Sequence, residues 1–231
     1  VIGPFGYMDK DGPDPIGNVT EVALFCASEE GMMVPDLEIC LVHRAPFGEK
    51  FFENVVKRVQ TGKPVQSVVE LVDPKVILSL PGLVRPLSRG WVKLASADPT
   101  DYPRINANYF AEEADLERTV DMVQIARDIY ATQTFKDEYN LIEVGPGYEV
   151  DTRDKLREWV KANIGSYYHF VGTCKMGIDN MAVVDSKLRV RGVEGLRVID
   201  GSIMPTITSA NPHTAIIMIG EKGADLIKAD M

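Results

Sequence analysis

Histidine is the side chain best suited to exchange a proton near neutral pH, and the sequence contains three, His43, His169 and His213. His169 lies in SYYHFVGTCKMG (166–177), and His213 follows an Asn-Pro pair near the C-terminus. An unperturbed imidazole has a pKa of about 6.5, so His169 and His213 are candidate bases. Each could instead be a packed structural ring, which is the more common role of a lone histidine. We expect His43, which ends a strand, to be structural.

The residues around His213 predict the start of a helix. Asn211 is a favourable N-cap and Pro212 suits the first helical position. The first amides of a helix have no intrahelical partners and carry partial positive charge, so an anion or an electron-rich ring would be stabilised there. The preceding stretch, IDGSIMPTITSANPH (199–213), is rich in small residues and permits close approach to a flat ligand.

Strands are expected in the first part of the chain and helices in the later part, and these elements must position the candidate residues. Period-two patterns predict strands, and steps of three and four predict helices. A break is expected at Pro81-Gly82, and two short strands are expected to flank Ser88–Gly90. The other expected strands are 19–26, 37–43, 68–72, 76–80 and 196–199, and the expected helices are 115–130, 152–163 and one from Asn211 onward. This order predicts an α+β fold whose sheet is mostly antiparallel.

Composition narrows the classes of partner. The 231 residues carry a formal net charge of −9, which disfavours nucleic acid and anionic membrane surfaces. No apolar run is long enough to span a membrane, and the first residues do not resemble a signal peptide. We therefore expect a soluble protein of unassigned compartment. Its three cysteines show neither metal-ligand spacing nor a disulfide framework, so no metal site is expected.

The C-terminal third resembles the glucose–methanol–choline (GMC) family of flavin oxidoreductases. The resemblance rests on YYHFVGTCKMG (167–177), on GLRVIDGSIMP (195–205) and on ANPHTAIIMIGEKGADLI (210–227), which occur in the family's order. LVRPLSRGWVKLASADPTDYPRINANYF (83–110) is similar to the family's substrate-domain signature. Together these motifs cover roughly residues 80–230, with a fainter match from about residue 18.

The resemblance implies a division of the chain and a cofactor. Residues 1–17 would be an irregular lead-in, 18–165 the substrate-binding domain, and 166–231 the C-terminal strand and helix of an FAD-binding domain. Phe25, Leu41 and Tyr167 are candidates for the substrate pocket, although core packing is the expected role of each.

The resemblance also implies oxidation of an alcohol to an aldehyde or ketone, with hydride passing to flavin N5. His169 matches the family's general base, and His213 would stabilise the developing alkoxide. Asp200 and Gly201 would contact the ribityl or phosphate region of FAD. The backbone amides of His213 and Thr214 would lie near the reduced flavin's negative charge, and Asn211 and Pro212, which lead into the helix, would also line the cofactor site.

The family's Gly-x-Gly-x-x-Gly turn for the FAD pyrophosphate does not occur in this sequence. We therefore expect a partner, an N-terminal FAD-binding chain or fragment of the same enzyme. Two alternatives stay open, a hydroxynitrile lyase that uses flavin without net oxidation and a non-catalytic subunit of a flavoprotein.

Overall fold

The computed structural model describes residues 5–7, 22–43, 76–139 and 142–230. These residues fall into two compact units. Unit 1 draws on Val1–Met32, Leu37–Leu83 and Leu116–Gly165, and unit 2 on Met33–Asp36, Val84–Asp115 and Ser166–Met231. The expected substrate-domain range, 18–165, therefore contributes to both units, and a unit boundary falls between Gly165 and Ser166.

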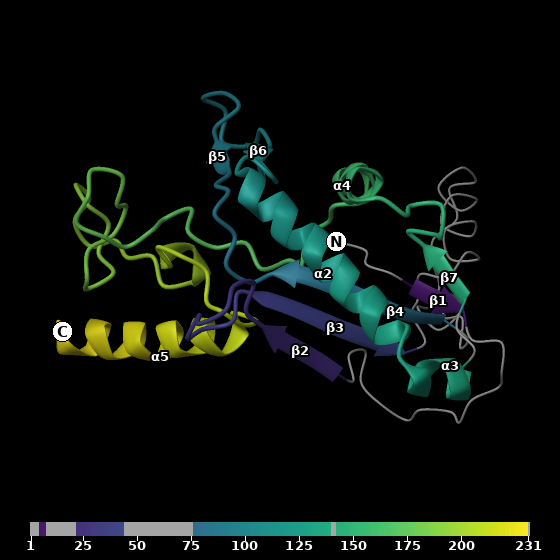
Figure 1. The fold of residues 1–231 in the computed structure, drawn as a ribbon. Helices are drawn as coiled ribbons and strands as arrows, with labels where there is room; N and C mark the ends of the chain where they lie inside the picture. The colour runs from purple at the N-terminus through teal and green to yellow at the C-terminus, as the bar shows by residue number, and fades with distance from the viewer. Residues whose placement is uncertain (1–4, 8–21, 44–75, 140–141, 231) are drawn as a thin grey trace, which may run out of the picture. The chain divides into compact units, whose positions relative to one another are not determined.

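Unit 1 is built on an antiparallel sheet, as predicted (Figure 1). Among the described residues the sheet has five strands in the order β2-β3-β4-β1-β7. Their bounds are β1 Phe5–Tyr7, β2 Val22–Cys26, β3 Leu37–His43, β4 Val76–Leu83 and β7 Ile142–Gly145. The predicted strand at 68–72 lies outside the described residues, and so does the side chain of His43.

The predicted break at Pro81-Gly82 is wrong, because β4 continues through it and pairs Pro81 with Ile39. Proline lacks one backbone donor but still accepts through its carbonyl, and the register with β3 holds from Ile77 to Leu83.

Helix α2 (Glu113–Tyr130) covers one face of this sheet (Figure 1). Met122 and Ala126 pack against Leu37 and Ile39 of β3, and all four are buried. At the end of the helix, the Tyr130 hydroxyl forms a 2.6 Å hydrogen bond with the buried Ser79 Oγ of β4. The helical spacing predicted this helix to within two residues.

Two further helices complete the described part of unit 1. Helix α3 (Gln133–Tyr139) was not predicted, whereas α4 (Arg153–Ala162) was. The side chain of Thr152 caps α4 by accepting a hydrogen bond from the Lys155 amide, and Leu156 and Val160 form its buried side.

Unit 2 contains fewer regular elements. Of the two strands expected to flank Ser88–Gly90, the second is β5 (Trp91–Lys93), and it pairs with β6 (Arg104–Asn106), which was not predicted. The last helix is α5 (His213–Ala229), and η2 (Gly201–Ile203) is a short 3-10 turn. The predicted strand at 196–199 does not form; a single bridge joins Arg197 to Arg189.

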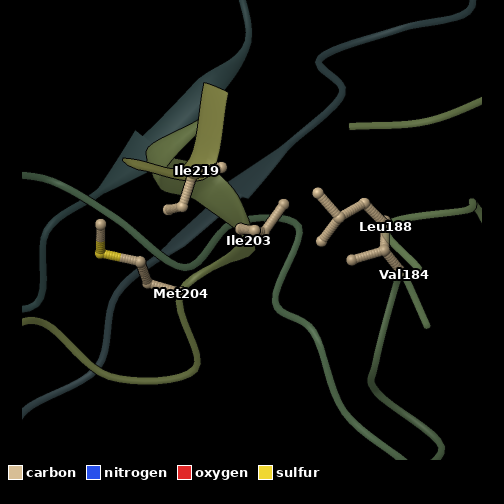
Figure 2. Packing of buried hydrophobic residues seen from close by; sticks show 5 residues of the cluster. All are labelled: Val184, Leu188, Ile203, Met204 and Ile219. Carbon is tan, nitrogen blue, oxygen red and sulfur yellow. The ribbon is translucent and has the colours of Figure 1, made fainter. Parts of the chain in front are cut away.

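The core of unit 2 packs one face of α5 against loops (Figure 2). Its buried members are Val184, Leu188, Ile203, Met204 and Ile219. Because only Ile219 comes from a long element, most of this core depends on turn geometry rather than on helical or strand periodicity. None of the helices in the described ranges is long and apolar enough to cross a bilayer.

Candidate active site

His169 follows a tight turn of unit 2. Tyr168 adopts a left-handed backbone with φ of +62°, and its amide donates a 2.7 Å hydrogen bond to Ser166 Oγ. A bulky residue rarely adopts this conformation, which is often retained where a side chain must be presented in one direction. The His169 ring is half-buried and lies 5.9 Å from the Tyr167 ring, centroid to centroid.

The segment after His169 is bonded to the Asp200–Met204 turn. The Cys174 amide donates to the Ser202 carbonyl at 2.9 Å, and the Met176 amide donates to the Ile203 carbonyl at 2.7 Å. Gly172 has φ of +89°, and a side chain there would begin 3.1 Å from the Met204 carbonyl oxygen. The histidine motif and the Asp-Gly-Ser motif are therefore held together by backbone hydrogen bonds.

Asp200 begins this turn by capping it. Its Oδ1 accepts a 2.7 Å hydrogen bond from the Ser202 amide and a second bond from the Ser202 hydroxyl. In the described part of the chain no hydrogen bond reaches Oδ2, and the residue is exposed. Asp200 thus has a structural role that the sequence did not predict, and one oxygen stays available to a ligand hydroxyl.

Gly201 is the point where three motif-bearing segments meet. A Cβ at this buried position would lie 3.1 Å from Ile216 Cδ1 of α5 and 3.6 Å from Val171 Cγ1. Val171 is two residues after His169, and Ile216 is three residues after His213. The structure therefore brings together the backbones on which both candidate histidines lie.

Helix α5 begins later than predicted. Its N-cap is Pro212 rather than Asn211, and the Pro212 carbonyl accepts the first helical bond from the Ile216 amide at 2.9 Å. A proline side chain offers no hydrogen-bond acceptor, so the cap residue does not satisfy the amides of the first turn. His213 and Thr214, which belong to that turn, are exposed.

The electrostatics of this helix start favour an anion. The first turn of α5 contains no acidic side chain, whereas that of α2 contains Glu113 and Asp115. The partial positive charge at the start of α5 is therefore not offset by its own side chains. The start of α5 therefore favours a negatively charged ligand.

The two imidazoles themselves are not in contact. Among the described residues, His169 makes a ring contact with Tyr167 and none with His213. The structure thus juxtaposes the motif backbones, and the convergence of the two rings on one ligand stays a prediction. Within the described ranges, no three His, Cys, Asp or Glu side chains cluster as metal ligands would.

The exposure of the two aromatic residues beside His169 was not predicted. Tyr168 is 91% exposed and Phe170 is 66% exposed, and exposed aromatic side chains beside a motif histidine are candidates for contact with a ligand. Of the pocket candidates, Leu41 packs on the β3–α2 core and Phe25 is 41% exposed.

Comparison with known proteins identifies the family. The sequence model described as GMC oxidoreductase matches residues 86–220, more than half of the chain. The chain belongs to the GMC oxidoreductase family. This membership confirms the resemblance predicted from the motifs, and the match includes all three segments that meet at Gly201.

Curated GMC relatives include the oxygen-dependent choline dehydrogenases of Escherichia coli. The enzyme of strain O45:K1 (S88) is 46% identical over 147 residues, which cover 64% of this chain and 26% of that protein. The enzyme of strain K12 is 45% identical over the same length. The matched part of the chain thus spans about a quarter of these relatives.

Solved structures of GMC oxidases share the fold. Pyridoxine 4-oxidase from Mesorbium loti has a TM-score of 0.74 at 23% identity, over 96% of this chain and 40% of that one. An R554K variant of formate oxidase from Aspergillus oryzae RIB40 has a TM-score of 0.69 at 30% identity, over 85% and 32%.

Proposed function

We propose that the chain is the C-terminal part of an FAD-dependent enzyme that oxidises an alcohol to an aldehyde or ketone. The observation that carries this proposal is the junction at Gly201, where the histidine motif, the Asp-Gly-Ser motif and the start of α5 meet. Membership in the GMC family and the names of the similar enzymes, dehydrogenases and oxidases, support an oxidation rather than a lyase reaction.

The residues at the junction fit a flavin. FAD, when bound, supplies the hydride acceptor that alcohol oxidation requires. The start of α5 would stabilise negative charge through the amides of His213 and Thr214, with Asn211 and Pro212 at the turn before them. Gly201 permits close approach, and the free Oδ2 of Asp200 would accept a hydrogen bond from a ligand hydroxyl.

The two histidines would divide the proton chemistry. His169 would accept the substrate hydroxyl proton on an imidazole nitrogen as the carbinol is oxidised. His213 would donate a ring N–H to the substrate oxygen and stabilise the charge that develops there. The half-buried ring of His169, ordered by the turn at Tyr168, suits a base that must keep one orientation.

The enzyme would need a second polypeptide region that holds the adenine and pyrophosphate of FAD. The matched part of the chain spans about a quarter of its curated relatives, and the sequence lacks a Gly-x-Gly-x-x-Gly turn. An N-terminal FAD-binding chain or fragment of the same enzyme would supply this region.

Replacement of the base in the complete flavoprotein tests the function. We expect His169→Ala to lower turnover by about 10²–10⁴-fold, the usual contribution of a general base, while FAD stays bound. The measurements are steady-state oxidation of a panel of alcohols, the pH profile of kcat/KM, and flavin absorbance. The matched control is His43→Ala, which should keep both turnover and flavin.

Turnover of His169→Ala close to that of the parent enzyme would remove this residue from the mechanism. Addition of alcohol without oxygen should bleach the flavin absorbance of the parent enzyme. A flavin that stays oxidised with every alcohol that the protein converts would instead indicate the lyase reaction.

A further inference from the structure

The chain reaches His169 through a turn that a tyrosine does not favour by itself. Tyr168 has φ of +62°, a left-handed conformation that is common for glycine and rare for a bulky residue. Its side chain is 91% exposed, so the packing of its own ring contributes little to holding the backbone in place. Another interaction must therefore stabilise this conformation.

The Ser166 hydroxyl supplies such an interaction. Its Oγ accepts a 2.7 Å hydrogen bond from the Tyr168 amide, two residues further along the chain. A serine that accepts from this amide closes a turn in the way that a backbone carbonyl would. The free energy of one hydrogen bond is comparable to the cost of a left-handed residue other than glycine, so loss of this bond is enough to let the turn open.

The turn sets the direction in which the His169 side chain projects. Downstream of the histidine, the backbone is fixed by the hydrogen bond from the Cys174 amide to the Ser202 carbonyl. Upstream, a rotation at Tyr168 would move the imidazole away from the Tyr167 ring, which lies 5.9 Å from it at an interplanar angle of 44°. Displacement of a catalytic group by about 1 Å can lower a rate by about 10²-fold, so this turn matters to a base.

We propose that Ser166 is a positioning residue whose hydroxyl holds the His169 imidazole in the orientation that proton transfer requires. The inference rests on the proposed function and adds to it the residue that orients the base. Ser166 acts through the Tyr168 backbone and touches neither the alcohol nor the flavin. Its loss should therefore lower the rate of oxidation without changing the shape of the pH profile.

Loss of the hydroxyl in the complete flavoprotein tests the proposal. We expect Ser166→Ala to lower kcat at least about 10-fold with flavin still bound, because the base is present but misplaced. Ser166→Thr keeps a hydroxyl at the same position and should stay within about 3-fold of the parent enzyme. The pH profile of kcat/KM should keep its midpoint in Ser166→Ala, whereas His169→Ala should lose the limb that reports the base.

The matched control is Ser96→Ala. Ser96 Oγ accepts a 3.0 Å hydrogen bond from the Asp98 amide, which is the same bond between residues two apart in another turn of unit 2. Ser96 is exposed and lies between β5 and β6. The control should turn over like the parent enzyme, and both alanine variants should keep the parent's circular dichroism.

A double-mutant cycle separates positioning from a direct role of the hydroxyl. Glycine adopts positive φ without steric cost, so in a Tyr168→Gly background Ser166→Ala should lower kcat by less than about 3-fold. A loss as large as the one measured with Tyr168 present would show that the hydroxyl acts on the reaction directly. That result would overturn the proposal.

A measurement without turnover follows the imidazole itself. Histidine labelled with ¹³C at Cε1 gives an NMR signal for His169 that His169→Ala identifies, and the neighbouring Tyr167 ring displaces its chemical shift. Ser166→Ala should move this signal in the same direction as Tyr167→Leu, and Ser96→Ala should leave it in place. If the parent enzyme oxidised no alcohol, the proposed function would fail, and this signal would still decide whether Ser166 orients the ring.

Three further results would overturn the proposal. They are turnover of Ser166→Ala equal to that of the parent enzyme, equal losses of turnover in Ser166→Ala and Ser96→Ala, and a His169 signal that Ser166→Ala leaves unchanged.

Discussion

The two units of the chain achieve burial in different ways. In unit 1, Met122 and Ala126 of α2 pack on Leu37 and Ile39 of β3, so two regular elements meet through residues at helical and strand spacing. In unit 2, four of the five buried core residues lie outside α5, in turns and loops. Residues at regular helical and strand spacing therefore form the core of unit 1, whereas close contacts at particular glycines and capping hydrogen bonds shape unit 2.

Truncation in the periodic core should have the largest effect. Met122 is fully buried between α2 and β3, so Met122→Ala should lower the free energy of unfolding by about 2–5 kcal/mol through lost burial and a residual cavity. Urea denaturation followed by circular dichroism measures this loss. Gln124→Ala, at an exposed position of the same helix, should change stability by less than about 0.5 kcal/mol. A loss below about 1 kcal/mol for Met122→Ala would show that this core is not tightly packed.

Alkaline pH should weaken unit 1 through Tyr130. Burial raises the pKa of the Tyr130 phenol from 10.0 to about 12, against the lowering effect of its hydrogen bond with Ser79. The folded chain therefore holds this proton more tightly, and stability should fall by an amount on the order of 2 kcal/mol as pH rises from about 10 to about 12. Tyr130→Phe should remove this part of the pH slope. Parallel slopes for the two proteins between those pH values would contradict the assignment.

Two glycines of α5 should respond in opposite directions to the same change. Gly223→Ala places a methyl group against Ile199 and should cost about 1–3 kcal/mol, because the core has no room for it. Gly220→Ala meets open space and should stabilise the helix by about 0.5–1 kcal/mol. Thermal unfolding of both variants measures the contrast. Stabilisation by both substitutions would mean that α5 is not held against Ile199.

The smallest effect should come from Asp185, a half-buried aspartate that caps a turn of unit 2. Hydrogen bonds from the Arg189 amide and side chain hold the pKa of the Asp185 carboxyl at about 2, below its ordinary value of 3.8. The folded chain therefore favours the ionised form, and the stability that Asp185 contributes is present above about pH 4 and lost as pH falls towards 2. Asp185→Asn should flatten this acid slope slightly. An unchanged slope between pH 4 and pH 2 would show that the cap contributes nothing measurable.

The same contrast explains which features the sequence could predict. Helices α2 and α4 were predicted closely, because their buried positions recur at helical spacing and Thr152 is a strong cap, and strands β2 and β3 were predicted from their β-branched and aromatic residues. The course of β4 through Pro81 was not, because it depends on pairing with β3, which comes from an earlier part of the chain. A local Pro-Gly pattern cannot show that a strand continues through it.

At the candidate site, the motifs indicated which residues could act but not the local backbone structure that holds them. The resemblance indicated His169, Asp200 and His213, yet the left-handed turn at Tyr168 and the capping role of Asp200 required coordinates. The expected strand at 196–199 did not form, because a stretch of four residues that contains three apolar side chains does not distinguish a strand from a bridge followed by a 3-10 turn. The exposure of Phe170 was equally hidden, since its type alone favours burial.

The contact at Gly201 has a consequence for how such a protein can diversify. The distance between the two histidine-bearing stretches is fixed by Val171, Ile216 and a residue with no side chain, none of which needs to touch a substrate. Side chains that surround the imidazoles can therefore be exchanged while the scaffold beneath them stays constant. A lineage built on this junction can vary the residues around the two histidines without changing the turn that connects the segments on which they lie.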